Sequence, residues 1–135
     1  MSEDCIFCKI IKGEIPCKKV YEDNDVLAFL NINGLTEGHT LVIPKQHYVN
    51  IFDIPEEILT KIAKVAKKLS LQYKEKLPCS GVNLLNANES CAHQCVFHFH
   101  LHVIPRNEKD GVDLDFHGPQ RTPAELDAVL QKIKN

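Results

Sequence analysis

The sequence predicts a single α+β domain built on a five-stranded antiparallel sheet. At 135 residues, with 44% hydrophobic and 25% charged residues, the chain has the size and composition of one globular domain with a continuous core. Short β-prone runs alternate irregularly with three stretches of helical periodicity, and the first strands are joined by short connections. Parallel strands need long crossovers, so short connections favour antiparallel pairing.

The first third of the chain is expected to form a short helix and then three strands. Residues 5–12 carry apolar side chains at helical spacing, and a glycine and a proline follow them. Residues 19–22 and 26–30 are short β-prone runs separated by the polar sequence E-D-N-D, which predicts a hairpin. A third strand is expected over residues 39–43, ended by the proline that follows.

The longest helix is predicted to begin near Asp53 and to end near Leu77. Asp53 and Glu56 have the spacing of a capping box. Pro78 disfavours helical backbone at the residue before it. The helical face between these ends is marked by Ile58, Leu59, Ile62, Ala66, Leu69 and Tyr73.

The second half is expected to add two strands and a final helix. Residues 81–86 form the predicted fourth strand, and residues 96–104 form the fifth. Residues 106–121 are polar and show no clear period, which indicates a loop or a tail that depends on a partner. Thr122 and Glu125 have capping-box spacing and precede an amphipathic helix. Its apolar face consists of Leu126, Val129, Leu130 and Ile133.

The fifth predicted strand carries three histidines at alternate positions. Residues 96–104 read V-F-H-F-H-L-H-V-I. Because successive side chains of a strand point to opposite faces, His98, His100 and His102 are predicted to line one face. The other face is predicted to be apolar, with Phe97, Phe99, Leu101 and Val103.

Imidazoles on one strand face suit phosphoryl chemistry. A neutral imidazole has an unprotonated ring nitrogen at pH 7, so it can attack an electrophile, and its ordinary pKa also suits proton transfer. Same-face positions lie roughly 6.5–7 Å apart, so three rings can border one tetrahedral group over the middle ring. The oxygens of a phosphoryl group need hydrogen-bond donors from the side, which the outer rings can supply.

Charge and cysteine content exclude several classes of protein. The net charge is −2 and the lysines and arginines form no basic block, which argues against nucleic-acid binding and against a polybasic membrane anchor. The acidic start and the short apolar runs fit neither a signal peptide nor a membrane span, so we expect a cytoplasmic protein. In that reducing compartment the six cysteines are expected to be free thiols or metal ligands.

The histidine motif resembles that of the histidine triad (HIT) nucleotide-binding family. The resembling sequence is H-F-H-L-H at residues 98–102, followed by Val103 and Ile104. Further similarity, in the same order as in the family, extends over residues 5 to about 106 and includes I-F-C-K-I-I-K-G-E-I-P at 6–16, K-V-Y-E-D at 19–23, L-A-F-L-N at 27–31, H-T-L-V-I-P-K at 39–45, His47, Asn86, Gln94 and Val96. We therefore expect one HIT domain over residues 1–135, with residues 107–135 as a C-terminal loop and helix.

The resemblance implies a homodimer and a hydrolase or transferase that attacks the α-phosphate of a purine nucleotide or nucleoside phosphoramidate. The middle histidine of the motif is the family's nucleophile, so His100 is expected to form a covalent nucleotidyl intermediate. His102 would hydrogen-bond phosphate oxygens or the leaving group, and His39 matches a further histidine near the phosphate.

The resemblance also assigns the residues that would bind the nucleotide. Asn31 occupies a position that commonly carries an acidic residue for the ribose, Cys95 stands where a serine is frequent, and His93 replaces a frequent glycine. Since only glycine adopts positive φ freely, the loop before Gln94 is expected to differ from the family's. Phosphate oxygens would be held by Asn86, Gln94, Cys95 and Val96, and the base and sugar would be walled by Phe7, Leu30 and Ile32.

Cys5 and Cys8 form a C-x-x-C pair, which alone is compatible with a metal half-site, a redox pair or two buried thiols. A subset of the family uses such a pair with histidines at the positions of His47 and His98 to bind zinc. The resemblance thus implies a structural zinc, with His98 serving the metal. Two other functions stay open: a hydrolase that binds a catalytic metal through all three histidines, and a nucleotide-binding protein with little turnover.

Overall fold

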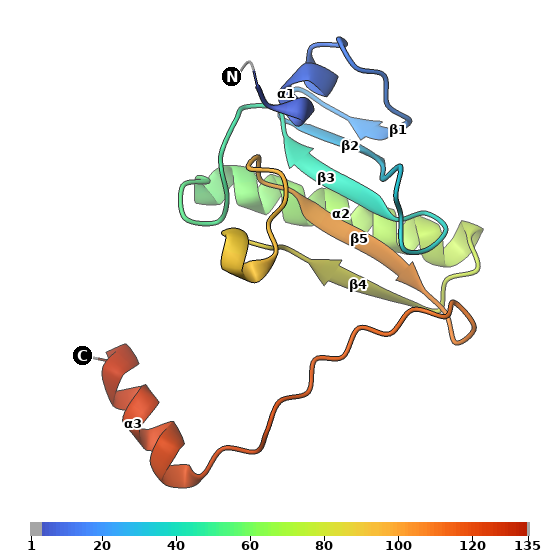
Figure 1. The fold of residues 1–135 in the computed structure, drawn as a ribbon. Helices are drawn as coiled ribbons and strands as arrows, with labels where there is room; N and C mark the ends of the chain where they lie inside the picture. The colour runs from blue at the N-terminus through green and yellow to red at the C-terminus, as the bar shows by residue number, and fades with distance from the viewer. Residues whose placement is uncertain (1–3, 135) are drawn as a thin grey trace.

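A computed structural model describes residues 4–134, and it confirms the predicted α+β class. The outermost residues of the expected domain, 1–3 and 135, lie outside the described part. Five strands form one antiparallel sheet in the order β1-β2-β3-β5-β4 (Figure 1). The elements are α1 (Ile6–Ile11), β1 (Lys19–Glu22), β2 (Val26–Leu30), β3 (Thr40–Pro44), α2 (Glu56–Lys76), β4 (Gly81–Leu85), the 3₁₀ turn η1 (Ser90–Ala92), β5 (Leu101–Arg106) and α3 (Pro123–Lys134).

The two faces of the sheet carry two separate apolar clusters. Figure 1 shows α2 running across one face, where Val26 and Ala28 of β2 pack with the buried side of the helix. On the other face Leu27 and Phe29 of the same strand pack with Phe7 of α1. The period of two along β2 produces this division, because adjacent residues point to opposite faces. The residues of α2 that are buried are Ile62, Val65, Ala66, Leu69 and Tyr73.

The early elements agree with the sequence predictions. The helix α1 falls within the predicted range 5–12, and β1 and β2 have the predicted bounds and form the expected hairpin. The third strand begins one residue later than predicted and includes Pro44, which stands opposite Val26 of β2. The prediction that this proline lies beyond the strand was wrong.

The predicted capping box of the long helix is absent. The cap position of α2 is Pro55, which has no side chain able to accept a hydrogen bond from the first turn. The Asp53 carboxylate instead accepts from the backbone N–H groups of Val49 (3.0 Å) and Asn50 (2.9 Å). It thereby stabilises the turn that precedes the helix. The predicted end is confirmed, because Lys76 is the last helical residue and Leu77 is the C-cap.

The histidine segment is only partly a strand. β5 begins at Leu101, so His98 and His100 precede it, and the predicted strand over 96–104 was wrong at its start. The backbone N–H of Phe99 donates to the carbonyl oxygen of Tyr48, 2.7 Å away, rather than to a neighbouring strand. The alternation of sides is nevertheless kept, since Phe99 is buried in the α2-side cluster while His98 and His100 contact Phe7.

The apolar side of the segment has three members rather than four. Phe99 and Val103 belong to the α2-side core, and Leu101 packs against it. Phe97 is 42% exposed and therefore does not contribute to the predicted backing.

The C-terminal part extends away from the sheet (Figure 1). The predicted capping box of α3 is confirmed, because the N–H of Thr122 donates to the Glu125 carboxylate and the N–H of Glu125 donates to the Thr122 hydroxyl. Every residue of α3 is exposed, including its apolar face. Within residues 4–134, no helix combines the length and apolar character needed to cross a bilayer.

Candidate functional site

The first histidine of the motif lies among sulfur atoms. The His98 side chain is fully buried, and its Nδ1 lies 3.4 Å from the Sγ of Cys5 and 3.6 Å from the Sγ of Cys8. The Nδ1 of His47 lies 3.3 Å from the Cys8 sulfur. One potential ligand atom from each of these four residues lies within 4.8 Å of every other. The structure thus brings together all four residues of the predicted metal set.

The geometry of the cluster fits a tetrahedral zinc ion. Bonds of about 2.3 Å to sulfur and about 2.0–2.1 Å to nitrogen place neighbouring ligand atoms of a tetrahedron ~3.6 Å apart. The observed sulfur to nitrogen distances of 3.3–3.6 Å match that spacing. Burial raises the pKa of the Cys5 thiol, so zinc binding there must release a proton.

The other ring nitrogen of His98 supports the same arrangement. Its Nε2 lies 2.8 Å from the backbone carbonyl oxygen of Pro44, an atom that can only accept, so Nε2 carries the hydrogen. Nδ1 is therefore unprotonated in the neutral ring and directs its lone pair at the cysteines. A backbone carbonyl that accepts from the other ring nitrogen commonly orients a metal-bound histidine.

His100 has the opposite tautomer. Its Nδ1 lies 2.9 Å from the backbone carbonyl oxygen of His98, so Nδ1 donates and Nε2 keeps its lone pair. The ring packs edge-on against Phe7, with centroids 5.3 Å apart, and against His102, with centroids 5.0 Å apart. The outcome is a fixed imidazole whose unprotonated Nε2 is free of any hydrogen bond within residues 4–134.

His102 is positioned by β5 and by a relay from a backbone amide. It stands opposite Leu41 of β3, so it faces the α1 side of the sheet. The N–H of Leu35 donates to Nδ1 of His39 at 2.9 Å, which leaves the ring hydrogen of neutral His39 on Nε2. This Nε2–H donates to Nδ1 of His102, also at 2.9 Å, so His102 must carry its own hydrogen on Nε2. His102 therefore presents a donor where His100 presents an acceptor.

Burial keeps these rings neutral at pH 7. Loss of solvation lowers the pKa of His100 and of His39 below the ordinary value, and it lowers the pKa of His102 to about 4. The charges that His100 and His39 would carry contribute further to the depression of the His102 pKa. Because an unprotonated ring nitrogen is the nucleophilic form of histidine, the reactive state of His100 is the populated one.

Of the predicted apolar wall, Phe7 lies beside the histidines and its role stays a prediction, whereas Leu30 lies away from them. Phe7 contacts both His98 and His100, with ring centroids 5.8 and 5.3 Å apart. Leu30 lies on the other face of the sheet, in a cavity of about 330 Å³ beside Tyr73 and Leu77. The residue that sequence reasoning missed is Phe29, whose ring meets Phe7 edge-on at 5.6 Å. The period of two along β2 could have indicated this, because Leu30 points to the same face as the core residues of β2 on the α2 side.

The predicted ribose-binding region lies at the end of β2. The side-chain oxygen of Asn31 accepts from the N–H of Asn33 at 2.9 Å, which closes a local turn. Ile32 is 95% exposed, so in this chain its side chain has no apolar neighbours to cover it. Both residues are accessible to a ligand, and their roles stay predictions.

Gln94 was predicted to contact phosphate, but its side chain is committed within the protein. Its amide nitrogen donates to the carbonyl oxygens of Val49 (2.7 Å) and Val96 (3.1 Å). Its amide oxygen accepts from the N–H of Glu89 (2.8 Å) and from Nδ2 of Asn50 (3.2 Å). A primary amide has two hydrogens and two lone pairs, so none is left for a ligand.

The loop before the histidines contains two residues in a backbone conformation that favours glycine. His93 has φ 70° and Glu89 has φ 75°, so His93 holds a backbone conformation that a glycine at this position would adopt freely, and the expected difference of this loop from the family's stays a prediction. Each such residue costs roughly 1–2 kcal/mol. Within residues 4–134, the backbone N–H groups of Cys95 and Val96 have no hydrogen-bond acceptor, so this loop offers donors rather than side-chain amides.

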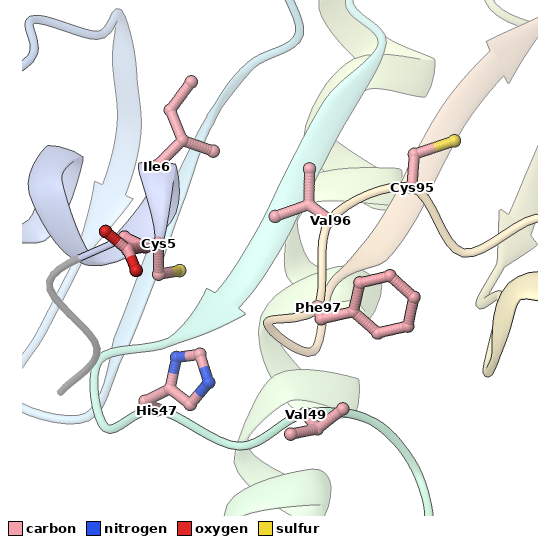
Figure 2. Close-up of a pocket in the computed structure, with 8 residues that line it drawn as sticks. Cys5, Ile6, His47, Val49, Cys95, Val96 and Phe97 are labelled. Atoms are coloured by element: carbon pink, nitrogen blue, oxygen red, sulfur yellow. The ribbon is translucent and has the colours of Figure 1, made fainter.

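A cavity of about 450 Å³ lies beside the histidine segment (Figure 2). Cys5 and Ile6 at the start of α1 line one side, and Val96 and Phe97 line another. His47, on the segment after β3, lies at the edge of the same cavity. The cavity thus lies between the cluster of cysteines and histidines and the loop that carries Cys95 and Val96, both of them predicted nucleotide contacts.

Relatives with similar sequences extend over nearly the whole chain. An uncharacterized HIT-like protein of Methanocaldococcus jannaschii is 48% identical over 130 residues, which cover 96% of this chain and 98% of the relative. An adenosine 5'-monophosphoramidase of Schizosaccharomyces pombe is 37% identical over 132 residues, covering 97% of this chain and 96% of the relative.

Solved structures confirm the fold. A protein of Streptococcus mutans superposes with a TM-score of 0.93 at 39% identity, covering 99% of this chain and 85% of that one. A zinc-bound histidine triad family protein of Mycobacterium smegmatis superposes with a TM-score of 0.78 at 37% identity, covering 97% of this chain and 96% of that one. The family described as HIT domain matches residues 12–109. With its fold, its histidine segment and these relatives in agreement, the chain belongs to the HIT domain family.

Proposed function

We propose that this protein hydrolyses purine nucleoside phosphoramidates, or related nucleotide esters and anhydrides, at the α-phosphate through a covalent nucleotidyl-His100 intermediate. The observation that carries the proposal is the hydrogen bond from Nδ1 of His100 to the His98 carbonyl oxygen, which leaves Nε2 as a fixed nucleophile. The adenosine 5'-monophosphoramidases among the relatives support this substrate class.

In the first step, Nε2 of His100 forms a bond to the α-phosphorus while the bond from phosphorus to the leaving group breaks. In the second step, water attacks the same phosphorus and the bond to Nε2 breaks. The hydroxyl of one water molecule thereby ends on phosphorus and its proton on the leaving group. The two steps return the imidazole unchanged and release a nucleoside monophosphate.

His102 supplies a donor to the reacting group. The relay from Leu35 through His39 holds the His102 hydrogen on Nε2, where it can bond a phosphate oxygen or the leaving atom. A preorganised donor stabilises charge that develops on these atoms in the transition state. The free N–H groups of Cys95 and Val96 are proposed to bind the other phosphate oxygens.

The nucleoside is proposed to lie against α1 and the end of β2. Phe7 supplies an apolar ring next to His100 and is backed by Phe29. Ile32 and Asn31 are proposed to contact the base and the ribose. Asn86 is proposed to contact phosphate through the side-chain hydrogen that its bond to the His100 carbonyl leaves free.

Zinc is proposed as a structural ion held by Cys5, Cys8, His47 and His98. The tetrahedral spacing and the orientation of His98 support this role, as does the zinc-bound relative. The ion would tie α1 to the segment that carries His100, and it would take no part in the reaction.

A catalytic metal held by the three histidines of the motif is less well supported. Nδ1 of His98 points to the cysteines, and Nδ1 of His100 donates to a carbonyl oxygen. The rings therefore do not converge on one ion. A nucleotide-binding protein with little turnover is the other alternative, and it is an outcome of the test below.

A homodimer and a cytoplasmic location remain part of the proposal. The edge strand β4 exposes Leu84, which is 53% accessible, and α3 exposes its whole apolar face. Burial of such surfaces favours association. Sedimentation equilibrium of the full chain is expected to give twice the monomer mass, and a monomer at micromolar concentration would contradict the dimer.

The test of the reaction is hydrolysis of adenosine 5'-phosphoramidate by the wild type, by His100→Ala and by the control His117→Ala. His117 is exposed on the C-terminal segment and bonds only with Asp115. The expected result is turnover by the wild type and the control, with none by His100→Ala, which still binds AMP. Tight AMP binding without turnover by the wild type would favour the binding-protein alternative.

A further inference from the structure

The segment that follows β3 holds the histidine segment residue by residue. Tyr48 accepts the N–H of Phe99, and Val49 accepts the side-chain amide of Gln94. Asn50, which is buried, donates from Nδ2 to the Glu89 carboxylate at 2.6 Å. The N–H of Ile51 donates to the side-chain oxygen of Asn88 at 2.7 Å. Residues 48–51 thus form a clamp, each with its own bond to residues 88–99.

The last of these bonds continues to the nucleophile. The side-chain nitrogen of Asn88 donates to Oδ1 of Asn86 at 2.6 Å. The side-chain nitrogen of Asn86 donates to the backbone carbonyl oxygen of His100 at 3.0 Å. Two side-chain amides therefore connect the N–H of Ile51 to the backbone of His100.

The two backbone groups at the ends of this series of hydrogen bonds fix the direction of every bond in it. A backbone N–H can only donate, so the atom of Asn88 that faces Ile51 is its oxygen. A backbone carbonyl can only accept, so the atom of Asn86 that faces His100 is its nitrogen. The two remaining atoms, the nitrogen of Asn88 and the oxygen of Asn86, then form a matched donor and acceptor. Neither amide can flip without placing like atoms against each other.

We propose that Asn88 is a positioning residue for His100: it orients the Asn86 amide, which in turn holds the His100 carbonyl. This inference deepens the proposed function and rests on it for the kinetic result alone. The bond from Asn86 fixes the peptide unit of His100, and the neighbouring carbonyl of His98 fixes its ring. Movement of this backbone would shift Nε2 from the line of attack on phosphorus, to which the rate is sensitive.

The clamp of residues 48–51 holds a loop whose backbone is strained. Glu89 and His93 hold left-handed backbone between Asn88 and the histidines. Gln94 stabilises this loop from within, through its bonds to Glu89, Val49 and Val96. Asn88 stands where the strained loop begins, and it donates to Asn86, the residue that bonds the His100 carbonyl.

The decisive variant is Asn88→Asp, which has nearly the same size but no donor. The carboxylate still accepts from Ile51, but it repels Oδ1 of Asn86. A flip of the Asn86 amide would relieve that repulsion and would place Oδ1 against the His100 carbonyl. The flipped arrangement loses the bond to His100, and the unflipped one keeps that bond only against the repulsion between the two oxygens. Asn88→Ala removes the link without adding a charge, and it replaces the aspartate variant if that variant does not fold.

The matched control is Asn107→Asp. Asn107 lies just after β5, donates from Nδ2 to the Pro78 carbonyl and accepts from the N–H of Lys109. The change from amide to carboxylate there also removes one donor to a carbonyl and keeps one acceptor. It differs from the Asn88 change in having no connection to His100.

Two readouts on each variant separate positioning from general stability. The first is kcat and KM for adenosine 5'-phosphoramidate, with the melting temperature measured in parallel. For Asn88→Asp we expect kcat to fall about tenfold or more and KM to change less than about threefold, while the control keeps its kcat. The second is the long-range ¹H–¹⁵N spectrum of the histidine rings, with His100 assigned by loss of its signals in His100→Asn.

The spectrum tests the positioning even if the wild type proves inactive. We expect the ¹⁵N shifts of His100 to report a single tautomer protonated at Nδ1 in the wild type and in the control, and a mixture in Asn88→Asp. If the wild type shows no turnover but Asn88→Asp still shows this spectral change, the proposed function is overturned and the positioning role of Asn88 is retained. An unchanged His100 spectrum, an unchanged kcat, or an equal loss in the control would overturn the role of Asn88.

Discussion

The histidine segment, residues 96–104, is proposed to have a metal end at His98 and a reaction end at His100, and these two rings differ in which nitrogen donates to a backbone carbonyl. At the metal end, Nε2 of His98 donates to the Pro44 carbonyl and Nδ1 faces two sulfur atoms. At the reaction end, Nδ1 of His100 donates to the His98 carbonyl and Nε2 stays free. The residue type is the same, and the position of the backbone acceptor determines which ring nitrogen keeps its lone pair.

The two ends also differ in the role that each is proposed to have. The metal end is proposed to stabilise the placement of the segment, because its residues come from the start of α1, from the segment after β3 and from the histidine motif. The reaction end is proposed to supply a nucleophile and a donor to the same phosphoryl group. Substitutions at one end are therefore expected to change properties that substitutions at the other end leave alone.

The largest effect on rate, after that of His100 itself, is expected at His102. His102→Ala removes the donor at the reaction end, and kcat for adenosine 5'-phosphoramidate should fall by about 10²–10³-fold. Zinc content, measured by inductively coupled plasma mass spectrometry, should remain that of the wild type. A variant that loses zinc along with activity would show that the two ends are not separate.

At the metal end, Cys8→Ser should have the reverse pattern. Cys8 is fully buried and contacts both His47 and His98, so its loss should abolish stoichiometric zinc binding. We expect the free energy of unfolding to drop by on the order of 3 kcal/mol and kcat to fall by only about tenfold. Urea denaturation and metal analysis check this result, with Cys91→Ser as the control because Cys91 is exposed. Unchanged stability in Cys8→Ser would contradict the structural role of the ion.

A smaller effect is expected from the relay behind His102. His39→Ala leaves Nδ1 of His102 without its donor, so the tautomer is no longer fixed and kcat should fall about tenfold. His39→Gln carries an amide that can both accept from Leu35 and donate to His102, so it should recover part of the rate. Equal rates for the alanine and glutamine variants would argue against a relay and for packing alone.

The smallest effect concerns the dependence of stability on pH. His102 binds a proton in the unfolded chain below its ordinary pKa of 6.5, but in the folded protein only below about 4. The unfolded state therefore binds more protons as the pH falls through this interval, and stability is lost from pH 6.5 towards pH 4. We expect a loss of about 1 kcal/mol between pH 7 and pH 5 that is smaller in His102→Gln. If calorimetry shows the same loss of stability in the wild type and in His102→Gln, His102 is not the source of that loss.

Sequence patterns predicted the fold well where local signals decide the structure. The turn sequence E-D-N-D separates two β-prone runs, and β1 and β2 have the predicted bounds. The capping box at Thr122 and Glu125 also forms, because the residues that make it are close in sequence and their bonds are local. At Asp53 the same spacing gave a wrong prediction, because the carboxylate accepts from the N–H groups of Val49 and Asn50 in the preceding turn.

The site was predictable in its members but not in its contacts. The period of two at the histidines correctly indicated which side chains share a side, yet it does not reveal whether a strand partner exists. Neither His98 nor His100 has one within residues 4–134, because the pairing of β3 with β5 stops at Val42 opposite Leu101, although β3 itself continues to Pro44. Two of the four bonds of the Gln94 amide, those with Val49 and Asn50, and the bond from Ile51 to Asn88 join residues about 40 positions apart, which no local pattern encodes.

Trapping the covalent intermediate tests the division between the two ends most directly. The wild type is mixed with adenosine 5'-phosphoramidate, quenched within one turnover and digested, and the modified residue is mapped by tandem mass spectrometry. The account predicts an adenylyl group on His100 and none on His98. An adenylyl group on another residue, or turnover at full rate in a variant that lacks His100, would contradict it.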